Sequence, residues 1–263
     1  NGFISRQKGS SAFDNTLDMH YGLSYAASTS FVPRKLDDRI DFSSRYGLQP
    51  KKWTAQAKGW KKNLYFMGLF RFQTQLSKGY DYSKTGWKDN PISQFLSPAY
   101  MTFALGMEWR NDDKFSLFVS PVAAKETFVS AHYTQNGTAF GVLQGKTSKA
   151  ELGAYLTAKF KVPIDSIIHY QSRLDLYSNY LAKDKKMEAG YIRHDSPKNI
   201  HILWDNFFSL KINKYIGAGL GFTLIYDNDQ PGQKTRNNNT EYGPLGWWQL
   251  KQILNVGFSY KFK

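Results

Sequence analysis

Three residues in two neighbouring segments have side chains suited to acid–base catalysis: the carboxylates Asp175 and Asp205 and the imidazole of His201. Carboxylates beside a histidine can activate a water molecule, which is the chemistry of a hydrolase. If the two segments form an antiparallel hairpin, Arg173 and Asp205 lie nearly opposite one another, with Asp175 close by. Charges that face a confined interior must be paired or hydrated. An ion-pair network is therefore the more ordinary explanation of these residues, and the sequence favours it over catalysis.

Other charged residues alternate with apolar residues in the same way, which places them on one face of a strand. We expect them to join a single network in the interior of the protein. Cations outnumber anions in this set, so an open interior would favour anions. The expected network consists of Arg39, Asp41, Arg45, Arg71, Glu108, Lys159, Arg173, Asp175, His201, Asp205, Lys211 and Lys251.

A serine hydrolase is the second catalytic option. Its nucleophile needs a histidine base within hydrogen-bond reach. Ser172 and Ser178 fall on the outward face of their segment, whereas His20, His169 and His201 fall on inward faces. No phosphate loop or zinc spacing occurs, and the absence of cysteine excludes disulfides and thiolate metal sites. We therefore expect no catalytic residues, no metal and no cofactor.

The stretch Gly246–Phe262 shows which kind of element positions these residues. From Trp248 onward, alternate positions are mostly apolar or aromatic, and the positions between them are mostly polar or small. A strand directs successive side chains to opposite faces. A transmembrane β-strand needs this arrangement over roughly ten residues, with apolar side chains toward lipid and polar ones toward the lumen.

The end of this stretch also resembles the C-terminal signal of bacterial outer-membrane barrels. That signal combines a polar residue, a glycine and two spaced aromatic residues, and Lys263 after the last aromatic residue departs from it slightly. The resemblance implies recognition by the barrel-assembly machinery during insertion. The residues concerned are Asn255, Gly257, Tyr260 and Phe262.

Alternation recurs along the chain and predicts one antiparallel up-and-down transmembrane β-barrel domain, 1–263, of about ten strands, or about twelve if an N-terminal pair is missing. Short turns alternate with long loops, which is typical of periplasmic turns and extracellular loops and predicts that both termini are periplasmic. The basic, tryptophan-containing connection 49–62 is an exception. The predicted strands are 13–25, 40–48, 64–76, 98–109, 115–122, 152–162, 168–180, 200–212, 216–226 and 246–262.

Composition agrees with a barrel. Mean hydropathy is −0.53 although aromatic residues make up 16% of the chain, as expected when a polar lumen offsets a lipid-facing surface. The sequence has no signal peptide at its start, so we expect a mature or truncated chain. A soluble sandwich or lipocalin-like barrel also alternates, but it would bury the apolar face.

The net charge of +14 indicates anionic partners. No nucleic-acid recognition motif accompanies the charge, so nucleic acid is not expected. Phosphates of outer-membrane lipids and of lipopolysaccharide are the expected partners, together with other outer-membrane proteins.

Several ordered blocks resemble an uncharacterised family of Bacteroidota outer-membrane proteins that carry a domain of unknown function (DUF3078-like). The likeness runs from about Phe13 to the end of the chain. It implies an outer-membrane location and brings no established activity or catalytic residues. The blocks are Thr74-Gln75 with Lys78-Gly79-Tyr80, then 92–100, 174–180, 210–216 and 224–229.

These observations favour a non-enzymatic structural or accessory component of the outer membrane, alone or as a subunit of a larger complex. A narrow channel for small anionic solutes is the second hypothesis, and an outer-membrane hydrolase of the omptin or phospholipase kind is the third. Paired charges in the lumen would favour the first. A water path lined by Arg71, Lys159, Lys211 and Lys251 would favour the second.

Overall fold

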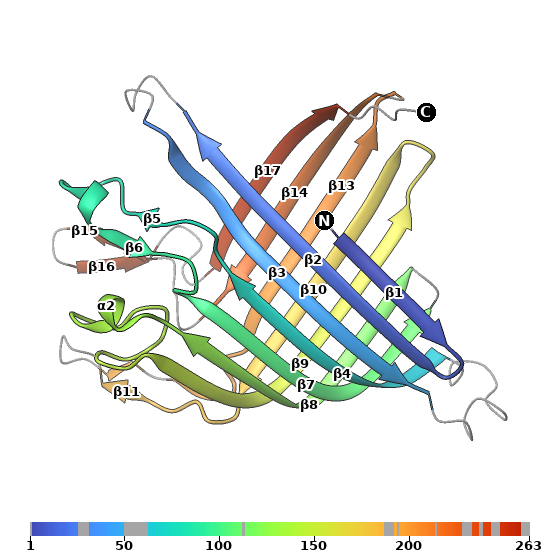
Figure 1. Cartoon of the computed structure of the whole chain (residues 1–263), viewed down its shortest axis with the longest axis horizontal. Helices are drawn as coiled ribbons and strands as arrows, with labels where there is room; N and C mark the ends of the chain where they lie inside the picture. Colours follow the sequence, from blue (N-terminus) through green and yellow to red (C-terminus); the bar gives the residue numbers. More distant parts are fainter. Residues whose placement is uncertain are drawn as a thin grey trace. The chain divides into compact units, whose positions relative to one another are not determined.

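The alternation in the sequence produces strands, and most of the strands belong to one sheet (Figure 1). The computed structural model describes residues 2–25, 32–49, 63–111, 114–186, 192–193, 195–213, 215–227, 233–236, 239–242 and 248–258. Within these residues an 11-stranded sheet forms, and neighbouring strands pair antiparallel from the first strand to the third and from the seventh to the last. The all-β, antiparallel fold class expected from the sequence is confirmed.

Strands that follow one another in the chain are neighbours in this sheet. Its order is β1 (Gly2–Lys8), β2 (Ser11–Ser24), β3 (Arg34–Leu48), β4 (Leu64–Thr74), β7 (Ala99–Asn111), β8 (Phe115–Phe128), β9 (Ser148–Pro163), β10 (Ile168–Asn179), β13 (His201–Lys211), β14 (Ile216–Tyr226) and β17 (Trp248–Phe258). This is the up-and-down connectivity that the sequence predicts.

The remaining elements lie in the long connections. Three two-stranded hairpins are β5 (Gly79–Tyr80) with β6 (Pro91–Ser93), β11 (Lys185–Lys186) with β12 (Ile192–Arg193), and β15 (Gln233–Arg236) with β16 (Asn239–Tyr242). Two short helices, η3 (Trp87–Asp89) and α2 (Ala131–Thr134), also belong to connections. The expected alternation is confirmed: 112–114, 164–167 and 212–215 are short, whereas 75–98, 129–147, 180–200 and 227–247 are long. Of the exceptional connection 49–62, residues 50–62 lie outside the described residues.

Several strand boundaries differ from the sequence-based expectation. β1 is a strand paired with β2 along its whole length, although its sequence alternates poorly. β3 begins at Arg34, earlier than predicted. The charged run before Ile40 does not alternate, and pairing with β2 stabilises the strand there. β8 runs through Pro121 to Phe128, so the predicted end of this strand at Val122 is wrong. Proline lacks an N–H but keeps its carbonyl, and the Pro121 carbonyl accepts a hydrogen bond from the Tyr180 hydroxyl at 3.1 Å.

Internal contacts divide the chain into two compact units. Unit 1 comprises Asn1–Lys51, Met67–Leu105 and Ala123–Leu152, and unit 2 comprises Lys52–Phe66, Gly106–Val122 and Gly153–Lys263. The boundaries fall within β4, β7, β8 and β9. Among the described residues, no helix has the length and apolar character needed to cross a membrane.

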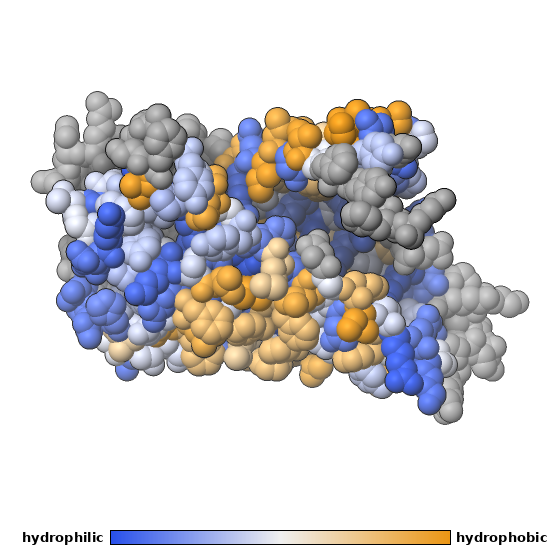
Figure 2. All heavy atoms as spheres, turned by 45° about the horizontal axis from the view of Figure 1, so that its top comes forward, coloured by the Kyte–Doolittle hydropathy of each residue, from blue (hydrophilic) through white to orange (hydrophobic). Residues whose placement is uncertain are grey.

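The two faces of the strands differ in polarity and burial. Charged side chains such as Glu108 and Asp41 are buried on one face, with exposed fractions of 0% and 7%. Large apolar side chains of the other face are open, with Leu105 67% and Leu254 76% exposed. Figure 2 shows hydrophobic residues gathered on the surface. A soluble sandwich would show the opposite pattern, so burial argues against that alternative. We call the two sides of the strands the polar face and the apolar face.

Candidate functional site

An ion pair between β3 and β4 in unit 1 is buried on both sides, with the side chains of Arg71 and Asp41 each 9% exposed. The guanidinium of Arg71 donates through Nε to Oδ1 of Asp41 at 2.9 Å and through Nη2 to Oδ2. Gln73 donates to the same carboxylate at 3.0 Å. Two parallel bonds from arginine to a carboxylate form a strong and geometrically specific pair. The structure thus brings together two residues of the expected network, Asp41 and Arg71, and adds Gln73.

The other two expected residues of unit 1 also lie on β3. Arg45 is 8% exposed and lies opposite Asp14 in the β2–β3 register. Arg39 lies opposite His20, and its Nε is buried without a hydrogen-bond partner. The polar face of unit 1 therefore holds several cations at different depths along one strand.

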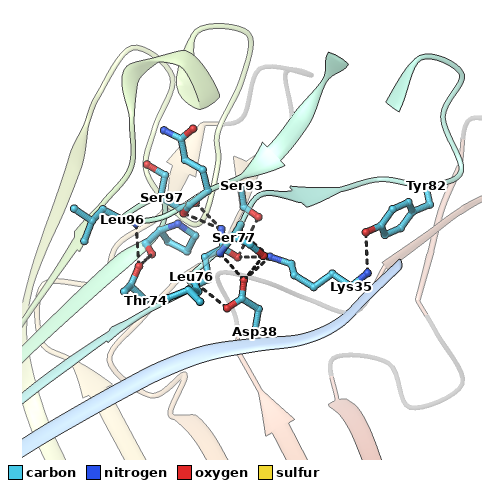
Figure 3. A network of polar contacts seen from close by, with 12 residues as sticks. Lys35, Asp38, Thr74, Leu76, Ser77, Tyr82, Ser93, Leu96 and Ser97 are labelled. Atoms are coloured by element: carbon cyan, nitrogen blue, oxygen red, sulfur yellow. Dashed lines mark hydrogen bonds and ion pairs between the residues drawn. The ribbon is translucent and has the colours of Figure 1, made fainter. Parts of the chain in front are cut away.

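A second network in unit 1 lies where strands end and connections begin (Figure 3). Asp38 accepts hydrogen bonds from the N–H of Leu76 at 2.7 Å and from both the N–H and the hydroxyl of Ser77 at 2.8 Å. Lys35 forms a 3.0 Å salt bridge with Asp38 and donates to the Ser77 carbonyl at 3.0 Å. Asp38 therefore fixes the start of the connection 75–98 to β3. We call the group Lys35, Asp38, Thr74, Gln75, Ser77, Ser93, Gln94 and Ser97 the Asp38 network.

The same network secures a tight turn, Gln94–Ser97. The backbones of Gln94 and Ser97 exchange two hydrogen bonds of 2.9 Å. The amide of Gln75 donates to the carbonyl of Gln94 at 2.9 Å and to that of Ser97 at 3.1 Å. Thr74 accepts from the N–H of Leu96 at 3.1 Å and donates to the Pro98 carbonyl at 3.0 Å. The turn is thus held from the end of β4 by two side chains.

Aromatic rings pack in the connection beside this network. Tyr80, Tyr82 and Trp87 form three mutual ring contacts with centroid separations of 4.8 to 6.2 Å. The Tyr82 hydroxyl accepts from the N–H of Lys35 at 2.8 Å, and the Arg34 guanidinium lies 5.3 Å from the centre of the Tyr82 ring. These contacts link the connection to the beginning of β3.

In unit 2, the β10–β13 hairpin places Arg173 opposite Asp205, which is the register that the sequence predicts. Arg173 binds Asp175 by a 2.9 Å salt bridge, and the Tyr155 hydroxyl donates to the same carboxylate at 3.0 Å. Asp205 accepts from the hydroxyl of Thr223 at 2.6 Å. These carboxylates are therefore held by donors on the neighbouring strands β9, β10 and β14.

The remaining expected residues of unit 2 are distributed along the strands. Glu108 is fully buried and accepts from Arg110 at 2.8 Å. Lys159 lies opposite Arg173 in the β9–β10 register, and Lys251 lies opposite Thr223 in the β14–β17 register. Lys211 is exposed at the end of β13. His201 Nδ1 lies 3.0 Å from Oδ1 of Asp227, at the other end of β13.

The glycines of β14 do not leave empty space on the polar face. A Cβ atom at Gly219 would lie 2.5 Å from the Phe207 ring, and one at Gly221 would lie 3.2 Å from it. The Asn255 amide oxygen also lies against Gly219. The Phe207 ring therefore covers Gly219 and Gly221.

A small polar cluster interrupts the apolar face of unit 2. Ser172 and Tyr170 both donate to the Asn206 amide oxygen, at 3.1 and 2.6 Å, and the Trp204 indole donates to Ser172 at 2.9 Å. Ser178, the other outward serine, donates to the Pro197 carbonyl at 2.7 Å. The Ser172 hydroxyl therefore donates its hydrogen bond to an amide oxygen. An amide oxygen is too weak a base to activate a nucleophile.

Two connecting segments carry aspartates whose pKa is lowered by local hydrogen bonds. The hydroxyl and N–H of Ser83 hold the pKa of the exposed Asp81 below its ordinary value. The N–H groups of Ile167 and Ile168 do the same for Asp165, in the turn between β9 and β10. Such bonds favour the charged carboxylate.

The C-terminal signal is described only in part. Asn255 and Gly257 lie on β17, opposite Gly219 and Gly217. Tyr260 and Phe262 lie outside the described residues. Among the residues that are described, no group of three or more acidic, histidine or cysteine side chains could hold a metal ion.

The expected charge network did not include the Asp38 network. Its carboxylate lies in a charged run that does not alternate, and its partners come from a distant connection. A signal was nevertheless present: Thr74, Gln75, Ser93, Gln94 and Ser97 belong to the blocks that carry the family resemblance.

Comparison with known proteins gives one family match. Residues 1–80 match the family model described as "Protein of unknown function (DUF3078)". The recognition of a DUF3078-like family is confirmed over this segment, which contains β1 to β5 and the first half of the Asp38 network. No curated protein matches the chain.

Proposed function

We propose that this chain is an integral outer-membrane β-barrel protein with a non-enzymatic, structural or accessory role. The observation that carries the proposal is the sidedness of the strands. Several charged side chains of the polar face are paired and wholly or largely buried, and many large apolar side chains of the other face are exposed. In water this arrangement loses the hydrophobic stabilisation of about 1.5–3 kcal/mol for each Leu or Phe that is left open. A lipid environment removes that loss, because the apolar face then contacts hydrocarbon.

The pairing of the charges supports the structural role over the channel hypothesis. Arg71, a residue that would line an anion path, is bound by Asp41. Arg173 and Arg110 are bound by Asp175 and Glu108. A cation whose charge is neutralised by a bidentate or close carboxylate attracts anions weakly.

The hydrogen bonds of Ser172 to Asn206 and Trp204 argue against a serine nucleophile on the apolar face.

Conductance in a planar lipid bilayer tests this proposal. Purified protein is added to a bilayer under a salt gradient, and its insertion is verified independently by heat-modifiable electrophoretic mobility of the reconstituted sample. We expect a heat-modifiable protein without steady conductance steps. Steady anion-selective steps that Lys211→Glu reduces would replace the structural role with a channel. Absence of both insertion and heat modifiability would overturn the membrane location itself.

A further inference from the structure

The Gln94–Ser97 turn combines two features that rarely occur together. Leu96 has φ 59°, in the left-handed region that non-glycine residues adopt with difficulty. The side chains at its tip are apolar and open, with Phe95 52% and Leu96 45% exposed. A left-handed conformation costs a residue with a Cβ about 1–2 kcal/mol. The surrounding structure must therefore enforce this conformation, and strain of this kind often marks a functional segment.

The Asp38 network enforces the left-handed conformation of Leu96. Gln75 donates to the carbonyls at both ends of the turn, and Thr74 accepts from the N–H of Leu96 itself. The hydroxyl of Ser97 accepts from the N–H of Ser130 at 2.9 Å, which ties the turn to the next long connection. Figure 3 shows the Leu96 side chain pointing away from these contacts. The polar network thus holds the backbone while the apolar side chains remain outside.

The position of Thr74 tells on which side of the sheet the turn lies. Side chains alternate along β4, and Thr74 shares its face with Phe66 and Phe70. Phe70 contacts Phe42 and Phe103 in a row of rings on the apolar face. Because the N–H of Leu96 donates a hydrogen bond to the Thr74 hydroxyl, the turn lies at the end of β4 on its apolar side. Phe95 and Leu96 thereby extend the apolar face beyond the last strand residue.

We propose that the Gln94–Ser97 turn is a rigid membrane anchor, in which Phe95 and Leu96 enter the lipid leaflet at the rim of the sheet. The proposal rests on the proposed membrane location. Leu76, at the start of the same connection, and Ile92, shortly before the turn, are also exposed, at 50% and 49%. A lipid surface fits better than water, because each of these side chains gains hydrophobic free energy on leaving water. Aromatic and aliphatic side chains at strand ends are typical of the interfacial zone of a barrel.

Depth-dependent fluorescence quenching tests the anchor. The chain contains no cysteine, so single cysteines can be labelled without a background. An environment-sensitive fluorophore is attached at Phe95→Cys, at Leu105→Cys on the apolar face and at Asp89→Cys in the exposed helix η3. Each labelled protein is reconstituted into phosphatidylcholine vesicles that contain nitroxide-labelled lipids, with the nitroxide either near the headgroup or deep in the acyl chain.

We expect the label at position 95 to be quenched more by shallow than by deep nitroxides, the label at 105 to be quenched by deep ones, and the label at 89 to respond to aqueous iodide. Quenching at 105 without quenching at 95 would overturn the anchor and leave the membrane location intact. Loss of lipid quenching at both positions would overturn the membrane location and the anchor with it. As a second variant, Leu96→Asn keeps a residue that tolerates the left-handed region, and it should reduce the shallow quenching at 95.

Discussion

Asp38 and Asp41 lie on the same strand but serve different purposes. Asp41 accepts hydrogen bonds from the guanidinium of Arg71 and the amide of Gln73, two side chains of β4. Asp38 receives two backbone N–H groups, a hydroxyl and an ammonium, and most of these belong to the connection that follows β4. One carboxylate neutralises a buried charge between strands, and the other orders a connection. The polar face and the strand ends should therefore respond differently to the loss of a carboxylate.

The largest effect is expected from Asp41→Ala. Removing one partner of a buried ion pair leaves an uncompensated charge and costs about 3–5 kcal/mol. Equilibrium unfolding by guanidinium in detergent micelles should show this as a lower midpoint. The double variant Asp41→Ala with Arg71→Ala is the matched control, and it should recover much of the lost stability. Equal destabilisation by the single and double variants would show that the Arg71 charge is not the cause.

The second effect concerns the strand end. Asp38→Asn weakens charge-assisted hydrogen bonds that are worth about 1.5–3 kcal/mol each in favourable cases. We expect faster hydrogen exchange at the amides of Leu76 and Ser77, with a smaller change in the global unfolding midpoint than for Asp41→Ala. Asp89→Asn, in the exposed helix of the same connection, serves as the control. Exchange that speeds up equally across β3 and β4 would contradict a local role for Asp38.

The third effect is the relief of backbone strain. Leu96→Asn removes an apolar side chain but places a residue that tolerates positive φ at a strained position, so it should recover up to about 1 kcal/mol and destabilise the protein less than a matched substitution without strain relief. The neighbouring Phe95→Asn removes a similar apolar side chain without relieving left-handed strain. Thermal unfolding in micelles compares the two variants. A lower midpoint for Leu96→Asn than for Phe95→Asn would show that the turn is not strained.

The smallest effect is expected at the exposed turn between β9 and β10. Because hydrogen bonds from Ile167 and Ile168 lower the pKa of Asp165, the turn is stabilised above the ordinary carboxyl pKa and loses this contribution as pH falls through the lowered value. Hydrogen exchange at Ile168, monitored as the pH is lowered below the ordinary carboxyl range, should reveal the loss after correction for the intrinsic rate. The variant Asp165→Asn should abolish this pH dependence.

The sequence predicts the strands well where one face is apolar. Alternation located β10, β13 and β14. Pairing the end of β10 with the start of β13 also placed Arg173 opposite Asp205, because the apolar pattern of both strands specifies their register. It predicted β1 and the start of β3 poorly. In both segments charged and apolar residues do not alternate, and strand pairing rather than local pattern determines the structure.

The side-chain network was harder to predict than the sheet. The partner of Asp41 lies on the next strand across a long connection, and Asp38 is completed by backbone groups that no residue type announces. The Phe207 ring of the adjacent strand covers Gly219 and Gly221 of β14, which the sequence alone does not reveal. Such contacts depend on register and on side-chain direction, which composition and periodicity leave open.

A nitroxide scan along β7 measures the sidedness of the strands. Single cysteines replace Phe103, Ala104, Leu105, Met107 and Glu108 in turn, and each spin-labelled protein is reconstituted into lipid vesicles. We expect lipid-soluble oxygen to accelerate the spin relaxation of labels at 103, 105 and 107, whereas labels at 104 and 108 are shielded from it. Preferential acceleration of relaxation at 103, 105 and 107 by a water-soluble nickel chelate would show that the apolar face lies in water and would overturn the proposed membrane location.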